Sequence, residues 1–152
     1  DVQAFQNGLA NTRWPGRLEI VNDSPLVVLD GAHNLPGMQA LTTTLQNDFK
    51  EIEIYVLVAI LADKQYQLML GEIASLPNVH LMLTNFAGPG PKRPSADLKK
   101  AAADIKTHWP IETAPSWQEG LLRLSREVSA DDAILITGSL YFISEVRRFF
   151  AD

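Results

Sequence analysis

The sequence predicts an α/β fold in which a mostly parallel sheet lies between two layers of helices. Apolar runs at residues 26–29, 52–60, 79–84 and 133–137 alternate with stretches of helical periodicity. The run at 52–60 is apolar at nearly every position, which is typical of a strand buried on both faces. Strands that alternate with helices imply parallel pairing through right-handed crossovers. A turn at residues 22–25 lets a short strand at 18–21 pair with 26–29 as an antiparallel hairpin.

The helices follow from apolar spacing and from capping residues. Ser95 and Ser116 stand where an N-cap side chain is favoured, and Glu119 completes a capping box with Ser116. A short edge strand is expected at 111–113. The predicted helices span residues 2–10, 36–49, 66–76, 95–106 and 116–128, with a last helix after Gly138-Ser139.

Composition narrows the class of protein. A chain of 152 residues suits one domain, and its 18 acidic against 13 basic residues give a net charge of −5. This balance argues against nucleic acid or anionic membranes as partners. No apolar run approaches the length that spans a bilayer. The absence of cysteine removes disulfides and thiolate metal sites and fits a reducing compartment. Because the chain starts at Asp1 without a signal-like segment, we expect a piece of a longer polypeptide.

The stretch Val27-Val28-Leu29-Asp30-Gly31-Ala32-His33-Asn34 predicts a buried strand, a tight loop and the start of a helix, with Pro36 in the first turn. A helix start exposes free N–H groups and the positive end of the helix dipole. Asp30, His33 and Asn34 could therefore hold a phosphate, its metal or a ribose. The alternative interpretation is an ordinary Asp-Gly turn in which Asn34 only caps the helix.

Polar residues follow four of the predicted strands, and the carboxyl ends of parallel strands meet at one edge of a sheet. They are the loop at 30–34, Asp63 with Lys64, the loop at 85–93, and Gly138 with Ser139. The gathering of polar residues at one edge of the sheet predicts a polar-ligand or phosphate site there. Simpler interpretations remain for single residues: Lys64 as a solvated lysine, Arg93 as a mobile loop charge and Ser139 as a helix cap.

Several motifs are absent from the sequence. It contains no G-x-x-x-x-G-K-[ST] phosphate loop, no His/Cys cluster with zinc spacing, no G-x-S-x-G elbow and no G-x-G-x-x-G after a strand. If ATP is used, another domain is expected to hold most of its phosphates.

Four blocks nevertheless resemble a known family. They are Trp14-Pro15-Gly16-Arg17-Leu18-Glu19, Asp30-Gly31-Ala32-His33-Asn34, Ala62-Asp63-Lys64, and Gly138-Ser139-Leu140-Tyr141-Phe142. Together they resemble, in order and over the whole chain, the C-terminal domain of folylpolyglutamate synthase/dihydrofolate synthase in the Mur ligase superfamily. The resemblance implies a Rossmann-like three-layer sandwich at residues 13–152, preceded by a linker at 1–12 from a missing N-terminal ATPase domain. Leu35 departs from the family pattern by separating the second block from Pro36.

The resemblance also implies an activity and a set of site residues. It implies a domain of an ATP-dependent amide ligase that adds L-glutamate to tetrahydrofolate or dihydropteroate through an acyl phosphate. Arg17, Asp30 and His33 would contact ATP, and Lys64 and Ser139 would contact glutamate. Neither a catalytic residue nor a metal ligand is assigned to this chain, because the Mg²⁺ ligands and the phosphate loop would lie in the N-terminal domain.

This chain would then be inactive alone, and the parent enzyme would be a cytoplasmic monomer. Two alternatives are another amino-acid ligase of the Mur superfamily and a non-catalytic nucleotide-binding α/β module.

Overall fold

A computed structural model describes residues 17–90 and 93–151. The linker expected at 1–12, the helix expected at 2–10 and the residues Trp14 to Gly16 lie outside the described residues.

The described strands form one six-stranded sheet in the order β1-β2-β6-β3-β4-β5. β1 pairs antiparallel with β2, and each remaining neighbouring pair is parallel. The predicted mostly parallel sheet and its antiparallel strand near the N-terminus are therefore confirmed. The strands are β1 (Glu19–Asp23), β2 (Leu26–Leu29), β3 (Ile54–Val58), β4 (Val79–Leu83), β5 (Glu112–Thr113) and β6 (Ala133–Thr137).

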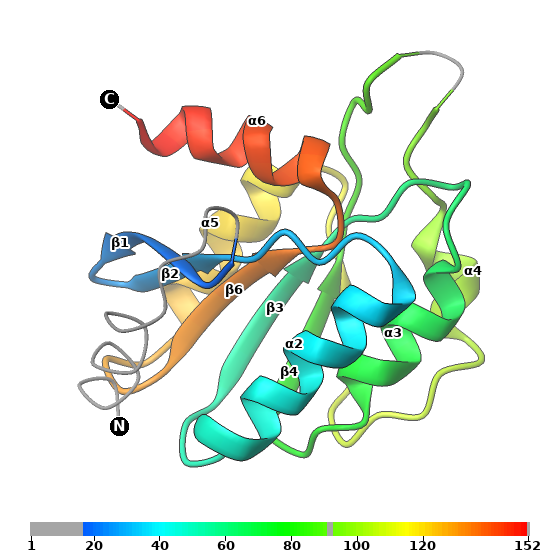
Figure 1. Cartoon of the computed structure of the whole chain (residues 1–152). Helices are drawn as coiled ribbons and strands as arrows, with labels where there is room; N and C mark the ends of the chain where they lie inside the picture. The colour runs from blue at the N-terminus through cyan, green and yellow to red at the C-terminus, as the bar shows by residue number, and fades with distance from the viewer. Residues whose placement is uncertain (1–16, 91–92, 152) are drawn as a thin grey trace.

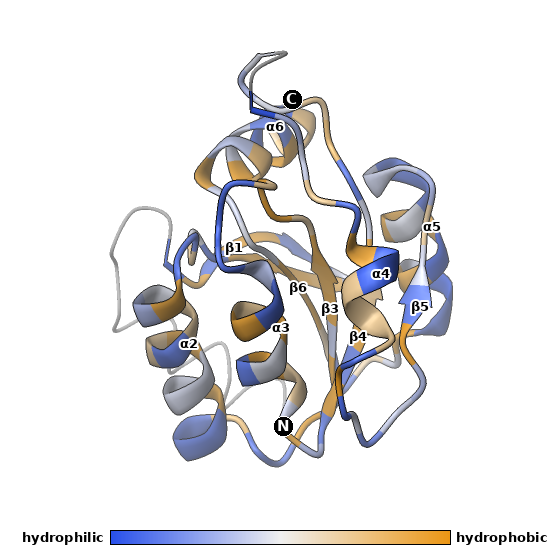
Figure 2. Cartoon of the chain, turned by 90° about the vertical axis from the view of Figure 1, so that its right-hand side faces the viewer, coloured by the Kyte–Doolittle hydropathy of each residue, from blue (hydrophilic) through white to orange (hydrophobic). Residues whose placement is uncertain are grey.

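Helices cover both faces of the sheet, as the apolar strands require (Figure 1). One face carries α2 (Leu35–Asp48), α3 (Tyr66–Ala74) and the short α4 (Leu98–Ala102). The other carries α5 (Trp117–Glu127) and α6 (Leu140–Phe150). Figure 2 shows hydrophobic and hydrophilic segments in both α2 and α3, and the hydrophobic residues Met38 and Leu45 of α2 and Ile73 of α3 are buried in the core on this face of the sheet. The result is the predicted three-layer sandwich.

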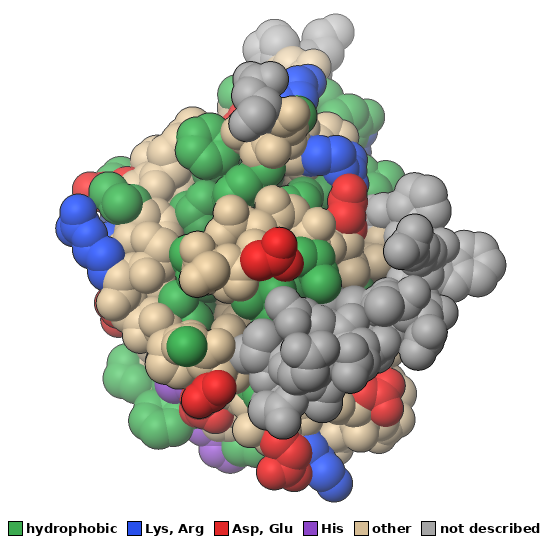
Figure 3. Space-filling model, turned by 90° about the vertical axis from the view of Figure 1, so that its left-hand side faces the viewer, with side chains coloured by type: hydrophobic (Ala, Val, Ile, Leu, Met, Phe, Trp, Pro, Cys, Tyr) green, Lys and Arg blue, Asp and Glu red, His purple; other side chains and the backbone are tan. Residues whose placement is uncertain are grey.

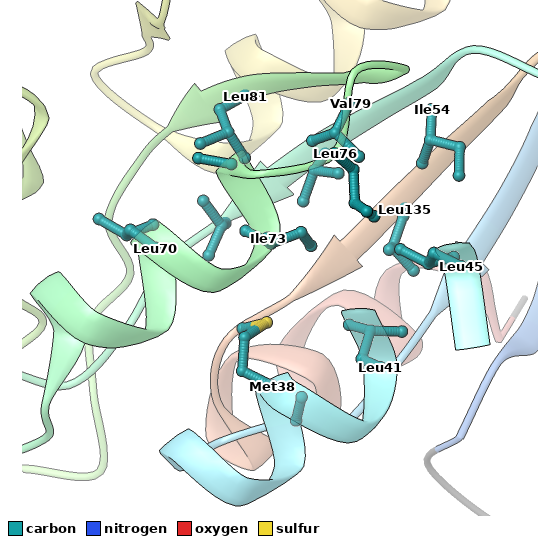
Figure 4. Close-up of a cluster of buried hydrophobic side chains, with 14 of the residues drawn as sticks. Met38, Leu41, Leu45, Ile54, Leu70, Ile73, Leu76, Val79, Leu81 and Leu135 are labelled. Atoms are coloured by element: carbon teal, nitrogen blue, oxygen red, sulfur yellow. The ribbon is translucent and has the colours of Figure 1, made fainter. Parts of the chain in front are cut away.

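Two apolar cores lie on the two sides of the sheet, because successive side chains of a strand point to opposite faces. In β3, Val56 belongs to the core under α2 and α3, whereas Leu57 belongs to the core under α5 and α6. Figure 4 shows the first core, where Met38 and Leu41 of α2 and Ile73 of α3 meet strand side chains.

Helix boundaries differ from the predicted ones where the loops are bonded to one another. The helix predicted at 95–106 with Ser95 as its cap is shorter: Asp97 caps α4, and its side chain accepts from the Lys99 N–H. The prediction for Ser95 was wrong because this residue forms an antiparallel bridge with Leu61. Asn34 caps α2 by accepting from the Gly37 N–H at 2.7 Å, so the helix starts at Leu35.

None of the helices among residues 17–90 and 93–151 is long and apolar enough to cross a membrane. On the face shown in Figure 3, the Lys and Arg side chains that the structure describes are scattered between acidic and hydrophobic ones. The described residues visible on that face form no continuous basic stripe for a polyanion.

Candidate functional site

The loops that leave β2, β6, β3 and β4 meet at one edge of the sheet, where the described parts of the loop after β4, residues 85–90 and 93–97, extend away from it (Figure 1). Backbone hydrogen bonds join these loops in pairs. The Gly138 N–H donates to the Ala32 carbonyl at 3.2 Å, and the Ala96 N–H donates to the Ile60 carbonyl at 2.7 Å. The Ala59 N–H donates to the Thr137 carbonyl at 3.3 Å and so joins the two pairs, which makes the edge one connected surface.

Gly138 makes this close approach possible. Its φ is +120°, a conformation that L side chains rarely adopt. A Cβ atom added here would stand 2.2 Å from the Ala59 carbonyl oxygen. Glycine thus lets the loop after β6 pack directly against the loop after β3.

These loops enclose a pocket of about 220 Å³. It collects side chains from the loops after β2, β3, β4 and β6: His33, Lys64, Arg93, Ser139 and Tyr141. Three of the five predicted site residues, His33, Lys64 and Ser139, therefore lie together. The volume is below the roughly 300–1,000 Å³ of pockets for drug-sized ligands, and it suits a ligand of amino-acid size.

Two wider hollows contain none of the predicted site residues. One of about 630 Å³ lies between α3 and residues 101–108. The other, of about 390 Å³, lies beside the ends of β4 and β5 and includes Thr84, Asn85 and Asp97. The small pocket is the one in which cationic side chains converge from several loops, so the chemistry favours it over the larger hollows.

Ser139 has two structural features that matter for a ligand. Its side chain caps α6 by accepting from the Tyr141 N–H at 3.2 Å, and the residue is only 2 % exposed. That bond uses an oxygen lone pair and leaves the hydroxyl hydrogen able to donate. The cap interpretation is thus confirmed, and it does not exclude a contact with an anion.

His33 is oriented by its own loop. Its Nδ1 lies 2.9 Å from the Gly31 carbonyl oxygen. A carbonyl can only accept, so we assign the proton to Nδ1. Nε2 is then the ring nitrogen that can meet a ligand at the pocket wall.

Arg93 is held at the same pocket by Asp63 and Tyr141. Its Nε donates to Asp63 Oδ2 at 2.9 Å, and a terminal nitrogen donates to Asp63 Oδ1 at 3.4 Å. The guanidinium carbon lies 5.6 Å from the centre of the Tyr141 ring. The hydrogen bond and charge of Arg93 lower the pKa of the Asp63 carboxyl, and Asp63 in turn raises the pKa of Arg93. The pair therefore stays fully charged at neutral pH.

Asp30 differs from the expected ligand-facing carboxylate. It is 5 % exposed, and its two oxygens accept from the N–H groups of Ala32 at 2.9 Å and Leu18 at 3.2 Å. Burial raises the pKa of this carboxyl, while the two N–H donors and the charge of Arg17 lower it. Asp30 thus joins the turn after β2 to the residue before β1. Neither Asp30 nor the exposed Arg17 lines the small pocket.

A metal centre is not formed by the described residues. Among residues 17–90 and 93–151, no three His, Asp or Glu side chains gather as a metal-binding group. The donor set of the pocket is mainly cationic and hydroxylic, which suits an anion and does not fit Mg²⁺.

Sequence reasoning assigned no definite role to three residues at this site. The sequence places Asp63 in a polar loop without predicting a role for it, and a mobile loop charge is the simpler interpretation of Arg93. Their pairing joins positions 30 residues apart, and no local pattern reports such a contact. Tyr141 stands in one of the four blocks that carry the family resemblance, but the pattern gives it no role of its own.

Comparisons with known proteins agree with this fold. Residues 16–140 match the family described as "Mur ligase, glutamate ligase domain". The folylpolyglutamate synthase of Lacticaseibacillus casei is 40 % identical over 147 residues, which are 96 % of this chain and 32 % of that protein. The dihydrofolate synthase/folylpolyglutamate synthase of Bacillus subtilis is 34 % identical over 151 residues, which are 96 % of this chain and 33 % of that protein.

A solved Mycobacterium tuberculosis folylpolyglutamate synthase, described as complexed with ADP and AMPPCP, superposes with a TM-score of 0.72 and 26 % identity. The match covers 95 % of this chain and 34 % of that structure. The chain therefore spans about a third of the length of these relatives. It belongs to the glutamate ligase domain family of the Mur ligases.

Proposed function

We propose that this chain is the C-terminal domain of an ATP-dependent ligase that adds L-glutamate to a folate. The observation that carries the proposal is the pocket at the carboxyl edge of the sheet, where Lys64, Arg93, His33 and Ser139 converge from four loops. Its size and its cationic lining suit a small dicarboxylate. The family match and the relatives named above, which are folylpolyglutamate synthases, support glutamate as that ligand.

In this proposal the residues divide between two substrates. Lys64 pairs with a carboxylate of L-glutamate, and the Ser139 hydroxyl donates to it. Arg17 and His33 face ATP across the junction with an N-terminal domain, and Asp30 contributes to the same ATP site from the buried turn behind them. A guanidinium such as that of Arg17 neutralises charge on the transferring phosphoryl oxygens. Because the Asp30 oxygens already accept two backbone N–H bonds, Asp30 would act mainly by fixing the loop that carries His33.

The chemistry requires activation of a carboxyl group before an amide forms. Phosphorylation of the folate carboxyl group by ATP makes phosphate the leaving group, and the amino group of L-glutamate then displaces it. The residues of this chain hold and orient the glutamate and exclude water from the reacting carboxyl. A phosphate loop is absent from the sequence and a metal-binding group is absent from the described part, so Mg²⁺ and most of the triphosphate are assigned to the N-terminal domain.

The parent protein in this proposal is a monomer. It is cytoplasmic, since the reaction needs ATP and since folate and L-glutamate are metabolites. Its folate acceptor is tetrahydrofolate or dihydropteroate. The 152-residue chain alone should not form the amide, because the parts that hold the triphosphate lie elsewhere.

The test uses the full-length polypeptide that carries this domain, with labelled L-glutamate, ATP and one acceptor at a time. We expect label to enter tetrahydrofolate or dihydropteroate and not a UDP-linked cell-wall precursor. Incorporation into the UDP-linked acceptor alone would replace folate by a Mur-type acceptor. A protein that binds nucleotide but ligates glutamate to none of these acceptors would favour a non-catalytic nucleotide-binding module.

A further inference from the structure

Leu18 has a backbone conformation that bulky residues rarely adopt. Its φ is +46°, in the left-handed region that favours glycine. The residue stands between the exposed Arg17 and Glu19, the first residue of β1. A strained conformation of this kind persists only where the surrounding structure holds it, and such conformations cluster at functional sites. In this chain, contacts on both sides of Leu18 hold the turn.

The first contact fixes the peptide group between Arg17 and Leu18. The Leu18 N–H, which belongs to this peptide group, donates to Asp30 Oδ2 at 3.2 Å. Because the peptide group is planar, a bond to its N–H sets the direction in which the chain leaves Arg17. The Leu18 side chain is buried in the core under α2 and α3, which anchors the turn from its other side.

The second contact is an ion pair between β1 and α6. Arg147 Nε donates to Glu19 Oε2 at 2.9 Å and to Glu19 Oε1 at 3.3 Å, and Arg147 Nη2 lies 2.8 Å from Oε2. Two guanidinium nitrogens thus meet one carboxylate, which fixes its orientation as well as its position. Ile143 and Val146 of α6 are buried in the core, so Arg147 extends from a firmly packed helix.

Stability is an incomplete explanation for this ion pair. The side chains of Arg147 and Glu19 are 39 % and 37 % exposed, and exposed ion pairs contribute little to the free energy of unfolding. The pair does, however, hold the residue that directly follows the strained turn. Its effect on the position of the chain before β1 is therefore larger than its effect on stability.

The register of β1 places Arg17 at the carboxyl edge of the sheet. Glu19 pairs with Leu29, the last residue of β2, in an antiparallel ladder. The chain just before Glu19 therefore lies beside the loop that follows β2 and carries His33. Burial raises the pKa of the Asp30 carboxyl, and the charge of Arg17 lowers it, so the two side chains are near one another. The exposed Arg17 thus stands beside this loop.

We propose that Glu19 and Arg147 are positioning residues that aim Arg17 at the phosphates of ATP. Together with the bond from the Leu18 N–H to Asp30, their ion pair holds the turn from which Arg17 extends. This inference rests on the proposed ligase function and adds the residues that orient its ATP-contacting arginine. A guanidinium stabilises a transferring phosphoryl group when it is already in place, and a misplacement of about 1 Å can lower a rate about a hundredfold.

The experiment measures steady-state kinetics of the full-length polypeptide, varying ATP and L-glutamate in turn. Arg147→Ala and Glu19→Gln each break the same ion pair, so each should lower kcat/KM for ATP by about tenfold to a hundredfold. The KM for L-glutamate should stay within about twofold, because neither residue lines the small pocket. Arg148→Ala is the matched control and should behave as wild type. Arg148 is the adjacent, exposed arginine of α6, and it forms no ion pair within residues 17–90 and 93–151.

A double-mutant cycle separates positioning from a merely structural role. Arg17→Ala alone should lower kcat/KM for ATP by more than either ion-pair variant does. If Arg147 acts through Arg17, the double variant Arg17→Ala/Arg147→Ala should be no slower than Arg17→Ala. A general disturbance of the domain would instead multiply the two losses. Arg147→Lys keeps the charge and part of the contact, so it should lose less activity than Arg147→Ala.

The failure of this inference can be told apart from that of the proposed function. A wild-type protein that ligates glutamate, combined with unchanged kcat/KM for ATP in both ion-pair variants, overturns the positioning role and leaves the proposed function standing. Losses that multiply in the double variant overturn it as well, because Arg147 would then act without Arg17. A wild-type protein that never ligates glutamate refutes the proposed function itself, and this inference with it.

Discussion

Replacement of Gly138 by alanine is the sharpest test of how the site is built. The added Cβ would meet the Ala59 carbonyl oxygen at 2.2 Å, whereas real Cβ atoms essentially never approach a heavy atom within 3.0 Å. The obstacle is backbone in a buried strand end, so it cannot rotate away as a flexible side chain could. Alanine must also hold a φ of +120°, which costs roughly 1–3 kcal/mol for a residue other than glycine.

Steric overlap in a packed region adds roughly another 1–3 kcal/mol. Together these give a loss of about 2–6 kcal/mol in the free energy of unfolding, a large part of the roughly 5–15 kcal/mol typical of a domain. At roughly 2–4 °C per kcal/mol for a chain of this size, the Tm should fall by about 4–24 °C. Thermal unfolding followed by circular dichroism measures this directly on the 152-residue chain.

Gly71→Ala is the matched control. Gly71 lies within α3, and a Cβ there meets nothing within 4 Å. Alanine favours a helix over glycine by about 1 kcal/mol, so this variant should be at least as stable as wild type. If Gly138→Ala unfolds at the wild-type temperature, the loops after β6 and β3 do not approach each other as described, and the pocket would need a different construction.

Two further variants test individual site residues. Ser139→Ala and Ser116→Ala each remove an N-cap side chain that accepts a backbone N–H at 3.2 Å, so each should cost about 1 kcal/mol of stability. Only Ser139→Ala should also raise the KM for L-glutamate in the full-length protein, and equal kinetics in the two variants would leave Ser139 as a cap alone. For Asp30, burial raises the pKa of the folded state above the ordinary 3.8. The folded chain therefore binds more protons than the unfolded chain between these two pKa values, and the contribution of Asp30 to stability falls as pH rises through that window. The stability of wild type relative to Asp30→Asn should accordingly grow as the pH is lowered from 7 toward 4 in urea unfolding; a difference that shrinks would show that the two N–H donors outweigh burial.

Much of the fold was predictable because its signals are local. The all-apolar segment around β3 required cover on both faces, and the turn at residues 22–25 produced the antiparallel β1–β2 pair. The end of the helix predicted at 95–106 was not predictable in this way. Ser95 is a good capping residue by composition, but its backbone pairs with Leu61, a residue 34 positions earlier in the chain. Tertiary pairing therefore overrode the local preference.

The site was predictable to the extent that topology places loops together. The rule that the carboxyl ends of parallel strands share an edge brought His33, Lys64 and Ser139 to one pocket. Direction and burial of single side chains do not follow from that rule. Asp30 turned inward to two backbone N–H groups, and Arg93 gained a defined place only through Asp63 and Tyr141.

The most direct test of the central claim is the kinetics of labelled L-glutamate incorporation into folate by the full-length polypeptide carrying Lys64→Ala. Lys100→Ala serves as the control, because Lys100 is exposed on α4 and does not line the pocket. The account predicts a rise in the KM for L-glutamate of about tenfold for Lys64→Ala and wild-type behaviour for Lys100→Ala. Equal glutamate KM values in wild type and both variants would contradict the assignment of this pocket to glutamate.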